Sequence, residues 1–114
     1  MYTLYITEAA ASDIRGAWLW YESQKTGLGG ALRATLSKII EDVALHPYAY
    51  QLRYDAVHIV FLYSYPYGLH YTVREKEKEI MLLGFFHTAQ SPKKMEKAQT
   101  ERMNRPNPRI GVNE

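Results

Sequence analysis

The sequence predicts an α+β domain in which a helical hairpin covers one face of an antiparallel sheet. Residues 8–45 carry apolar side chains at helical spacing, with one interruption by glycines. Residues 57–87 fall into three short runs rich in β-branched and aromatic residues, which is typical of strands. A chain of 114 residues suffices for one domain with an ordinary core.

The N-terminal segment predicts a short strand followed by a helix. Residues 2–7 alternate around Leu4 and Ile6, and Thr7 can cap a helix that continues to about Gln24. Trp20 lies off the apolar stripe of this helix. It either fills a groove against a second layer, which the usual burial of large aromatic residues favours, or stays exposed for a partner.

Glycines separate the first helix from a second one. Gly27, Gly29 and Gly30 lack the preceding strand and the following Lys-Ser/Thr pair of a phosphate-binding loop, so we interpret them as a helix-to-helix turn. The second helix is predicted over about residues 28–45, and Pro47 prevents its continuation.

Three strands are predicted next, over residues 57–63, 67–74 and 80–87. A turn at residues 65–68 and a charged tip at residues 75–79 join them. The third strand is apolar on both faces, which indicates a position inside the sheet. Residues 48–54 form a connector or lead into the first of these strands.

A short helix is predicted over residues 93–103, with Ser91 as its cap. We therefore expect a single domain over residues 1–103 in the order β-α-α-β-β-β-α, and a flexible tail over residues 104–114.

The sheet face opposite the hairpin is expected to be apolar and only partly covered by the last helix. Such a face usually receives another polypeptide. The expected partner contacts combine apolar side chains of this face with an aromatic residue of the first helix and cations of the last helix: Val60, Leu62, Met81, Leu83, Phe85, Trp20, Lys93 and Lys97.

Composition narrows the function classes. The chain has no cysteine, which excludes disulfides and thiolate metal sites, and its four histidines lack paired spacing, so we expect no metal and no cofactor. A net charge of +2 is too small to indicate nucleic-acid binding. No apolar run reaches membrane-spanning length and no signal peptide is evident, which predicts a soluble cytoplasmic protein without a membrane partner.

An ordered set of motifs resembles the RelE/ParE superfamily of toxins from bacterial type II toxin–antitoxin modules, over about residues 2–95. The set comprises the Gly27-Leu28-Gly29 turn, a helix ending in His46-Pro47, Tyr65-Pro66-Tyr67 with Tyr71 four residues on, and Phe86-His87 followed by Pro92. The resemblance implies a small cytosolic toxin that forms a hetero-oligomer with its antitoxin, whose disordered segment folds across the toxin.

The resemblance also implies one of two targets. ParE-like members poison DNA gyrase, whereas RelE-like members cut messenger RNA on the ribosome with a cluster of Lys and Arg. In this sequence His58 stands where the family often has arginine, Tyr63 and Ser64 stand at usually basic positions, and Ala89 and Gln90 replace a common basic pair. We therefore favour a ParE-like protein that acts by binding and is not an enzyme. The alternatives are a ribosome-dependent endoribonuclease and a degenerate member of low potency.

An RNA-cleaving site would need a base, an acid and cations for the phosphate. The remaining weak candidates are His58, His70, Arg74 and His87. The first three could share one sheet face, although strand histidines more often contact solvent or a partner. His87 is either functional or a strand end that hydrogen-bonds to the backbone.

Overall fold

The structure is a computed structural model, and it describes residues 1–89 and 109–111. It contains β1 (Thr3–Thr7), α1 (Glu8–Gln24), α2 (Leu28–Leu45), β2 (Leu52–Tyr54), β3 (Val57–Phe61), β4 (Tyr67–Arg74), β5 (Glu79–His87) and β6 (Arg109–Gly111). The predicted α+β class is confirmed. The helix predicted over residues 93–103 lies outside the described residues. Of the helices in the described part, none has the length and apolar character needed to cross a membrane.

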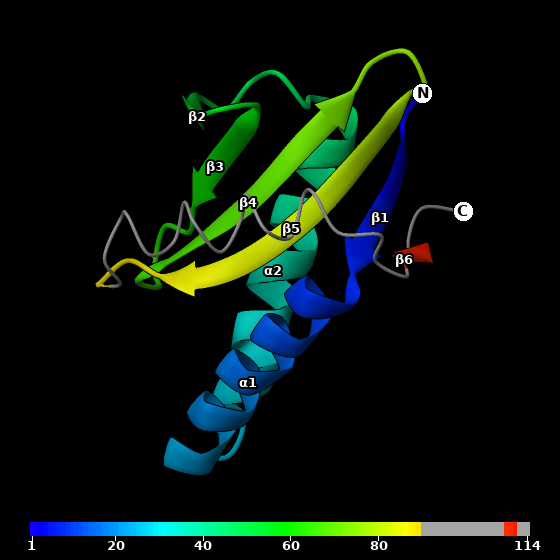
Figure 1. The fold of residues 1–114 in the computed structure, drawn as a ribbon. Coiled ribbons are helices and arrows are strands. Elements are labelled where there is room, and N and C mark those ends of the chain that lie inside the picture. The colour runs from blue at the N-terminus through cyan, green and yellow to red at the C-terminus, as the bar shows by residue number, and fades with distance from the viewer. Residues whose placement is uncertain (90–108, 112–114) are drawn as a thin grey trace.

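The strands form one mixed sheet in the order β2-β3-β4-β5-β1-β6. Strands β3, β4 and β5 pair antiparallel, as predicted, and β2 pairs antiparallel with β3, but β1 pairs parallel with β5. The sheet is therefore not antiparallel throughout. Figure 1 shows the α1–α2 hairpin against one face of the sheet, with the turn between the helices projecting past the sheet.

Thr7 joins the start of α1 to the centre of the sheet. Its buried hydroxyl accepts a hydrogen bond from the Ala10 backbone N–H at 3.1 Å, which confirms the predicted cap. The same hydroxyl donates to the Leu82 carbonyl in β5 at 3.0 Å. One side chain thus fixes where the helix begins and how it sits on β5.

The glycine-rich turn between the helices holds a carboxylate of its own chain. Gly27 has a φ of 97°, a conformation that favours glycine. The Glu22 carboxylate accepts the Gly27 N–H at 3.0 and 3.1 Å and the Gly29 N–H at 2.9 Å. These backbone hydrogen bonds lower the pKa of Glu22, and the bond from Gly27 has the largest effect. A carboxylate at the N-terminus of α2 therefore fastens the two helices together.

The core lies between the hairpin and the sheet, and it corrects one prediction. Val60, Leu62 and Phe85, expected on the opposite face, belong to the core cluster on the helix side. For Phe85 the cause is a bulge in β5: His70 pairs with Gly84 whereas Tyr71 pairs with Leu82. The extra residue shifts the alternation of side chains by one position. The buried members of this core are Leu4, Ala10, Ala17, Leu32, Leu36, Val43, Val60, Leu62, Leu69, Tyr71, Ile80, Leu82 and Phe85.

The centre of the opposite face is not bare. Ile59, Leu83 and Phe86 are buried, contrary to the expectation of an exposed apolar surface there. Exposed large apolar side chains occur elsewhere: Met1 at the start of the chain, Leu19, Trp20 and Leu28 on the hairpin, Leu45 and Tyr48 around the end of α2, and Leu52, Phe61 and Tyr63 towards the β2–β3 edge.

Two strands occupy segments that sequence analysis left undecided or assigned differently. β2 forms a hairpin with β3 in which Asp55 has a φ of 44°. β6 pairs antiparallel with β1 at the edge of the sheet, within the segment predicted as a flexible tail. Prolines at positions 106 and 108, just before β6, weakened any strand signal there.

Two neighbouring glycines of α2 provide a matched test of the helix packing. A Cβ at Gly29 would lie 2.6 Å from the Trp18 backbone oxygen, whereas one at Gly30 would meet nothing within 4 Å. We expect Gly29→Ala to lower the free energy of unfolding by about 1–3 kcal/mol through overpacking. Gly30→Ala should instead raise it by up to about 1 kcal/mol through helix propensity. Guanidinium unfolding measures both, and equal effects would contradict the close approach of α1 and α2.

Candidate functional site

His58 lies on the helix side of the sheet in a packed setting. Its ring stacks on Tyr71 at 5.1 Å between centroids, with an interplanar angle of 13°. Its Nδ1 is 2.9 Å from the Tyr50 carbonyl oxygen, so Nδ1 carries the proton in this bond. The side chain is 8% exposed. His58 thus supports the segment that connects α2 to β2.

His70 lies on the opposite face from His58. In the β3–β4 pair His58 faces Tyr71, the neighbour of His70, and neighbouring strand residues point to opposite faces. The Nδ1 of His70 is 3.0 Å from the Tyr54 hydroxyl oxygen, and its ring meets Phe86 edge-on. The side chain is 1% exposed. The expectation that His58 and His70 share a face is therefore wrong.

Arg74 and His87 lie at opposite ends of the β4–β5 ladder. The Arg74 guanidinium lies 3.6 Å from the Glu79 carboxylate in a partly exposed ion pair. His87 ends β5, where its Nδ1 accepts the Ala89 backbone N–H at 3.0 Å. Because Tyr67 pairs with His87 whereas Arg74 pairs with Glu79, the whole length of the β4–β5 ladder separates the two candidates.

A group of rings that includes His87 joins α1 to the sheet. Tyr67 stacks on Phe85 at 4.7 Å and meets His87 edge-on at 5.2 Å. Tyr21 meets Tyr65 edge-on at 5.4 Å. Burial raises the pKa of Tyr67. We call this set, Trp20, Tyr21, Tyr65, Tyr67, Phe85 and His87, the ring cluster.

Trp20 forms the exposed end of the ring cluster. Its ring meets Tyr21 edge-on at 5.1 Å, yet 57% of the residue stays exposed. The favoured expectation that it fills a groove is wrong. Trp20 lies on the solvent-facing side of α1, where Gly16 and Leu19 are exposed as well.

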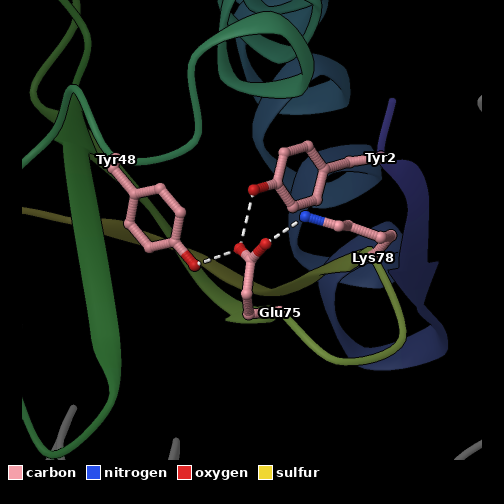
Figure 2. Close-up of polar contacts among 4 residues, drawn as sticks. All are labelled: Tyr2, Tyr48, Glu75 and Lys78. Carbon is pink, nitrogen blue, oxygen red and sulfur yellow. Dashed lines mark hydrogen bonds and ion pairs between the residues drawn. The ribbon is translucent and has the colours of Figure 1, made fainter.

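A polar cluster that sequence analysis missed lies at the other end of the sheet. One oxygen of the Glu75 carboxylate accepts hydrogen bonds from the Tyr2 and Tyr48 hydroxyls, each at 2.7 Å. The other oxygen forms an ion pair with Lys78 (Figure 2). We call Tyr2, Tyr48, Glu75 and Lys78 the Glu75 cluster. Only the Glu75–Lys78 spacing is visible in the sequence, because the tyrosines come from distant segments.

The Glu75 cluster has strongly shifted protonation equilibria. The bond with Lys78, followed by those from Tyr48 and Tyr2, lowers the pKa of Glu75 to about 2. The bond to the Glu75 carboxylate raises the pKa of Tyr48 to about 12. At neutral pH the carboxylate is therefore ionised and both phenols keep their protons. A carboxylate with so low a pKa is a poor general base. The Glu75 cluster instead links the N-terminal segment and the connector after α2 to the β4–β5 turn.

The connector between α2 and β2 is fastened at further points. The Tyr71 hydroxyl donates to the Pro47 carbonyl at 2.7 Å, and the Tyr50 hydroxyl donates to the Asp42 carboxylate at 2.5 Å. Burial raises the pKa of Tyr71, which keeps its hydroxyl a donor. With the contacts of His58 and Tyr48, these bonds hold the connector against the sheet.

The candidate residues therefore do not form one site. The four catalytic candidates lie in four separate settings, and no group of three or more His, Cys, Asp or Glu residues within 1–89 and 109–111 is placed to hold a metal. Of the predicted partner contacts, Val60, Leu62, Leu83 and Phe85 are buried, Met81 is half-buried and Trp20 is exposed. Lys93 and Lys97 lie outside the described residues.

Comparison with known proteins identifies the fold. No protein-family model and no curated protein matches this sequence. The structure is similar to the isolated E. coli RelE toxin, with 22% identity and a TM-score of 0.60 over 89% of this chain and 99% of that chain. It is similar to the intact E. coli RelBE toxin–antitoxin complex, with 23% identity and a TM-score of 0.60 over 80% and 100% of the two chains.

The chromosomal ParDE toxin–antitoxin system from P. aeruginosa is a third similar structure. It shares 22% identity and a TM-score of 0.57 over 76% of this chain and 96% of that chain. The fold implied by the resemblance in the sequence is thus confirmed, and it is common to the RelE and ParE structures.

The shifted pKa of Glu75 predicts a specific acid dependence of stability. Because its folded value of about 2 lies below the ordinary 4.5, Glu75 stabilises the fold above pH 4.5 and loses this effect as the pH falls towards 2. The difference in free energy of unfolding between the wild type and Glu75→Gln should be largest above pH 4.5 and shrink below it. Urea unfolding across this range provides the measurement.

The matched control is Glu77→Gln, in the same exposed turn. Because the phenols of Tyr2 and Tyr48 bond to Glu75, the free energy of unfolding of Glu77→Gln should not show the pH dependence expected for Glu75→Gln. A difference for Glu75→Gln that stays constant from pH 2 to neutral pH would contradict the cluster.

Proposed function

We propose that this chain is the toxin of a bacterial type II toxin–antitoxin pair, in the ParE-like branch of the RelE/ParE superfamily. In this proposal a cognate antitoxin holds the toxin inactive in the cytoplasm, and the free toxin inhibits DNA gyrase by binding it. The proposal rests on the fold together with the dispersed arrangement of the candidate catalytic residues.

The fold supports the toxin part of the proposal. Two of the similar structures are, by their names, toxin–antitoxin systems, RelBE and ParDE. The matches cover 99%, 100% and 96% of the compared chains in these structures. Because RelE and ParE share the fold, the choice between the two branches depends on the side chains.

The separation of the candidate residues is the observation that favours binding over RNA cleavage. Cleavage at a 2′-hydroxyl requires a base, an acid and a phosphate-binding cation within reach of one another. His58 and His70 point to opposite faces of the sheet, and both are buried. Arg74 is engaged with Glu79, at the far end of the ladder from His87. Among the described residues, these groups cannot meet around one phosphate.

A binding role also fits the surface of the chain. Leu19 and Trp20 of the projecting hairpin and Phe61 of β3 are large apolar residues that stay about half exposed. Aromatic residues of this kind contribute much of the energy of protein–protein contacts. Among the described residues that the sequence predicted as partner contacts, Trp20 is the most exposed and Met81 is half-buried.

Gyrase activity tests the target. We expect the purified full chain to inhibit DNA supercoiling by gyrase in a dose-dependent manner. Addition of the antitoxin, the product of the adjacent reading frame, should restore supercoiling at equimolar amounts. Supercoiling that continues at saturating concentrations of the folded chain would overturn the target.

A translation extract tests the alternative chemistry with the same preparation. The proposal expects transcripts to remain intact when the chain is added to translating ribosomes. Transcript cleavage that disappears in both His87→Ala and Arg74→Ala would instead establish a ribosome-dependent endoribonuclease. Growth that is unaffected by strong expression without the antitoxin would support a degenerate member of low potency.

A further inference from the structure

One edge of the sheet is formed by β2, and the side of β2 away from β3 has no neighbouring strand among the residues that the structure describes. The Ile59 backbone N–H donates to the Gln51 carbonyl at 3.2 Å, which directs the carbonyl of Gln51 towards β3. Backbone groups alternate in direction along an antiparallel pair, so those of Leu52, the next residue, are directed away from β3. They offer one donor and one acceptor to a further strand.

Large apolar side chains stay exposed on both faces of the sheet near this edge. Leu52 pairs with His58, so its side chain lies on the hairpin side, where the residue is 53% exposed. Phe61 comes three positions after His58 in β3, so alternation places it on the opposite face, and it is 48% exposed. The rim of the sheet at β2 and β3 is therefore apolar on either side.

Arg53 adds a cation to this rim. Its guanidinium carbon lies 5.2 Å from the centroid of the Phe61 ring. A Cβ at Gly68 would lie 3.3 Å from two carbons of the same ring, so the lack of a side chain at Gly68 lets the ring rest against β4. Arg53 is exposed, and within residues 1–89 and 109–111 no salt bridge involves it. The rim thus presents a fixed aromatic ring together with a cation that lacks a carboxylate partner.

The charge of Arg53 selects between two kinds of occupant for the free edge. If the β2 edges of two copies paired about a two-fold axis at Leu52, their Arg53 side chains would become diagonal neighbours on one face. Like charges in this position repel, and charged side chains commonly protect sheet edges from self-pairing. A strand with a carboxylate opposite Arg53 gains an ion pair instead. The charge therefore favours a strand from a different protein over a second copy.

We propose that the free edge of β2 binds an extended, acidic segment of a partner protein, which adds a strand to the sheet. The backbone of Leu52 provides hydrogen bonds to this strand, as in other cases of strand addition. The side chains of Leu52 and Phe61 provide apolar contacts, and Arg53 selects for a carboxylate. The proposal does not depend on the target of the toxin.

A short palindromic peptide, Thr-Val-Glu-Val-Thr, tests this edge. With glutamate opposite Arg53, a valine lies opposite Leu52, and the sequence is the same in either strand direction. We expect titration of the isotope-labelled full chain to shift the backbone amide NMR signals of Gln51, Leu52 and Arg53 most, with a dissociation constant of about 1 mM. The peptide Thr-Val-Lys-Val-Thr should bind at least about tenfold more weakly.

A charge reversal in the protein tests the role of Arg53. Arg53→Glu should invert the preference, so that the lysine peptide binds more tightly than the glutamate peptide. Arg33→Glu is the matched control, because Arg33 is also an exposed arginine over an aromatic ring, at 4.9 Å from the centroid of Trp18, but it lies on α2. This control should keep the preference of the wild type.

Backbone methylation of the peptide tests strand addition itself. A glutamate peptide that is N-methylated at both valines cannot donate a backbone hydrogen bond to the carbonyl of Leu52, although its charge is unchanged. It should bind at least about tenfold more weakly than the unmodified peptide. Equal binding of the two would show an ion pair without strand addition and would contradict the proposal.

Three further results would overturn the proposal. The first is the absence of shifts in β2 at peptide concentrations well above the expected dissociation constant. The second is an Arg53→Glu variant that is folded and keeps the preference of the wild type for the glutamate peptide. The third is a dimer of the wild type in sedimentation that the glutamate peptide dissociates, which would assign the edge to a second copy.

Discussion

The bulge in β5 is the constraint on which the arrangement of this domain depends. β5 pairs with β4 on one side and with β1 on the other, so its side chains are directed to the two faces of the sheet. The bulge places Phe85 on the helix side together with Ile80 and Leu82. The Asp13 carboxylate of α1 accepts the Phe85 backbone N–H at 3.1 Å, which provides a partner where the ladder is disturbed. The hydrogen bond from Phe85 to Asp13 thus fixes α1 relative to the bulged part of β5.

This arrangement determines which contacts the polar side chains of the sheet can make. With β3 and β4 in their observed register, His58 is directed into the stack on Tyr71 and His70 into the contact with Tyr54 and Phe86. Each histidine forms a hydrogen bond with another segment of the chain, and the Glu75 carboxylate likewise accepts hydrogen bonds from two distant tyrosines. These ionisable groups therefore hold segments of the chain's own fold together.

Local signals in the sequence predicted the helices and the longest hairpin strand closely. The cap at Thr7, the glycines after Gln24 and the proline at position 47 act within a few residues, and α1 and α2 have the predicted bounds. Long-range features were missed. A one-residue bulge leaves no mark in an apolar run such as residues 80–87, yet it inverts every face assignment beyond it. The two tyrosine partners of Glu75 come from segments 73 and 27 residues away, so no spacing rule could bring them together.

The exposure of Trp20 is the most instructive failure of sequence reasoning. Burial statistics favour a covered tryptophan, but they presuppose a second layer over every part of a helix. The Glu22 carboxylate stabilises the turn of the hairpin from within, through the backbone N–H groups of Gly27 and Gly29. These hydrogen bonds stabilise the end of the hairpin without contacts to the sheet, so the outer side chains there are not required for packing. Apolar residues that the fold does not need are best explained by a contact outside the chain, and Leu19 and Trp20 of α1 are two such residues.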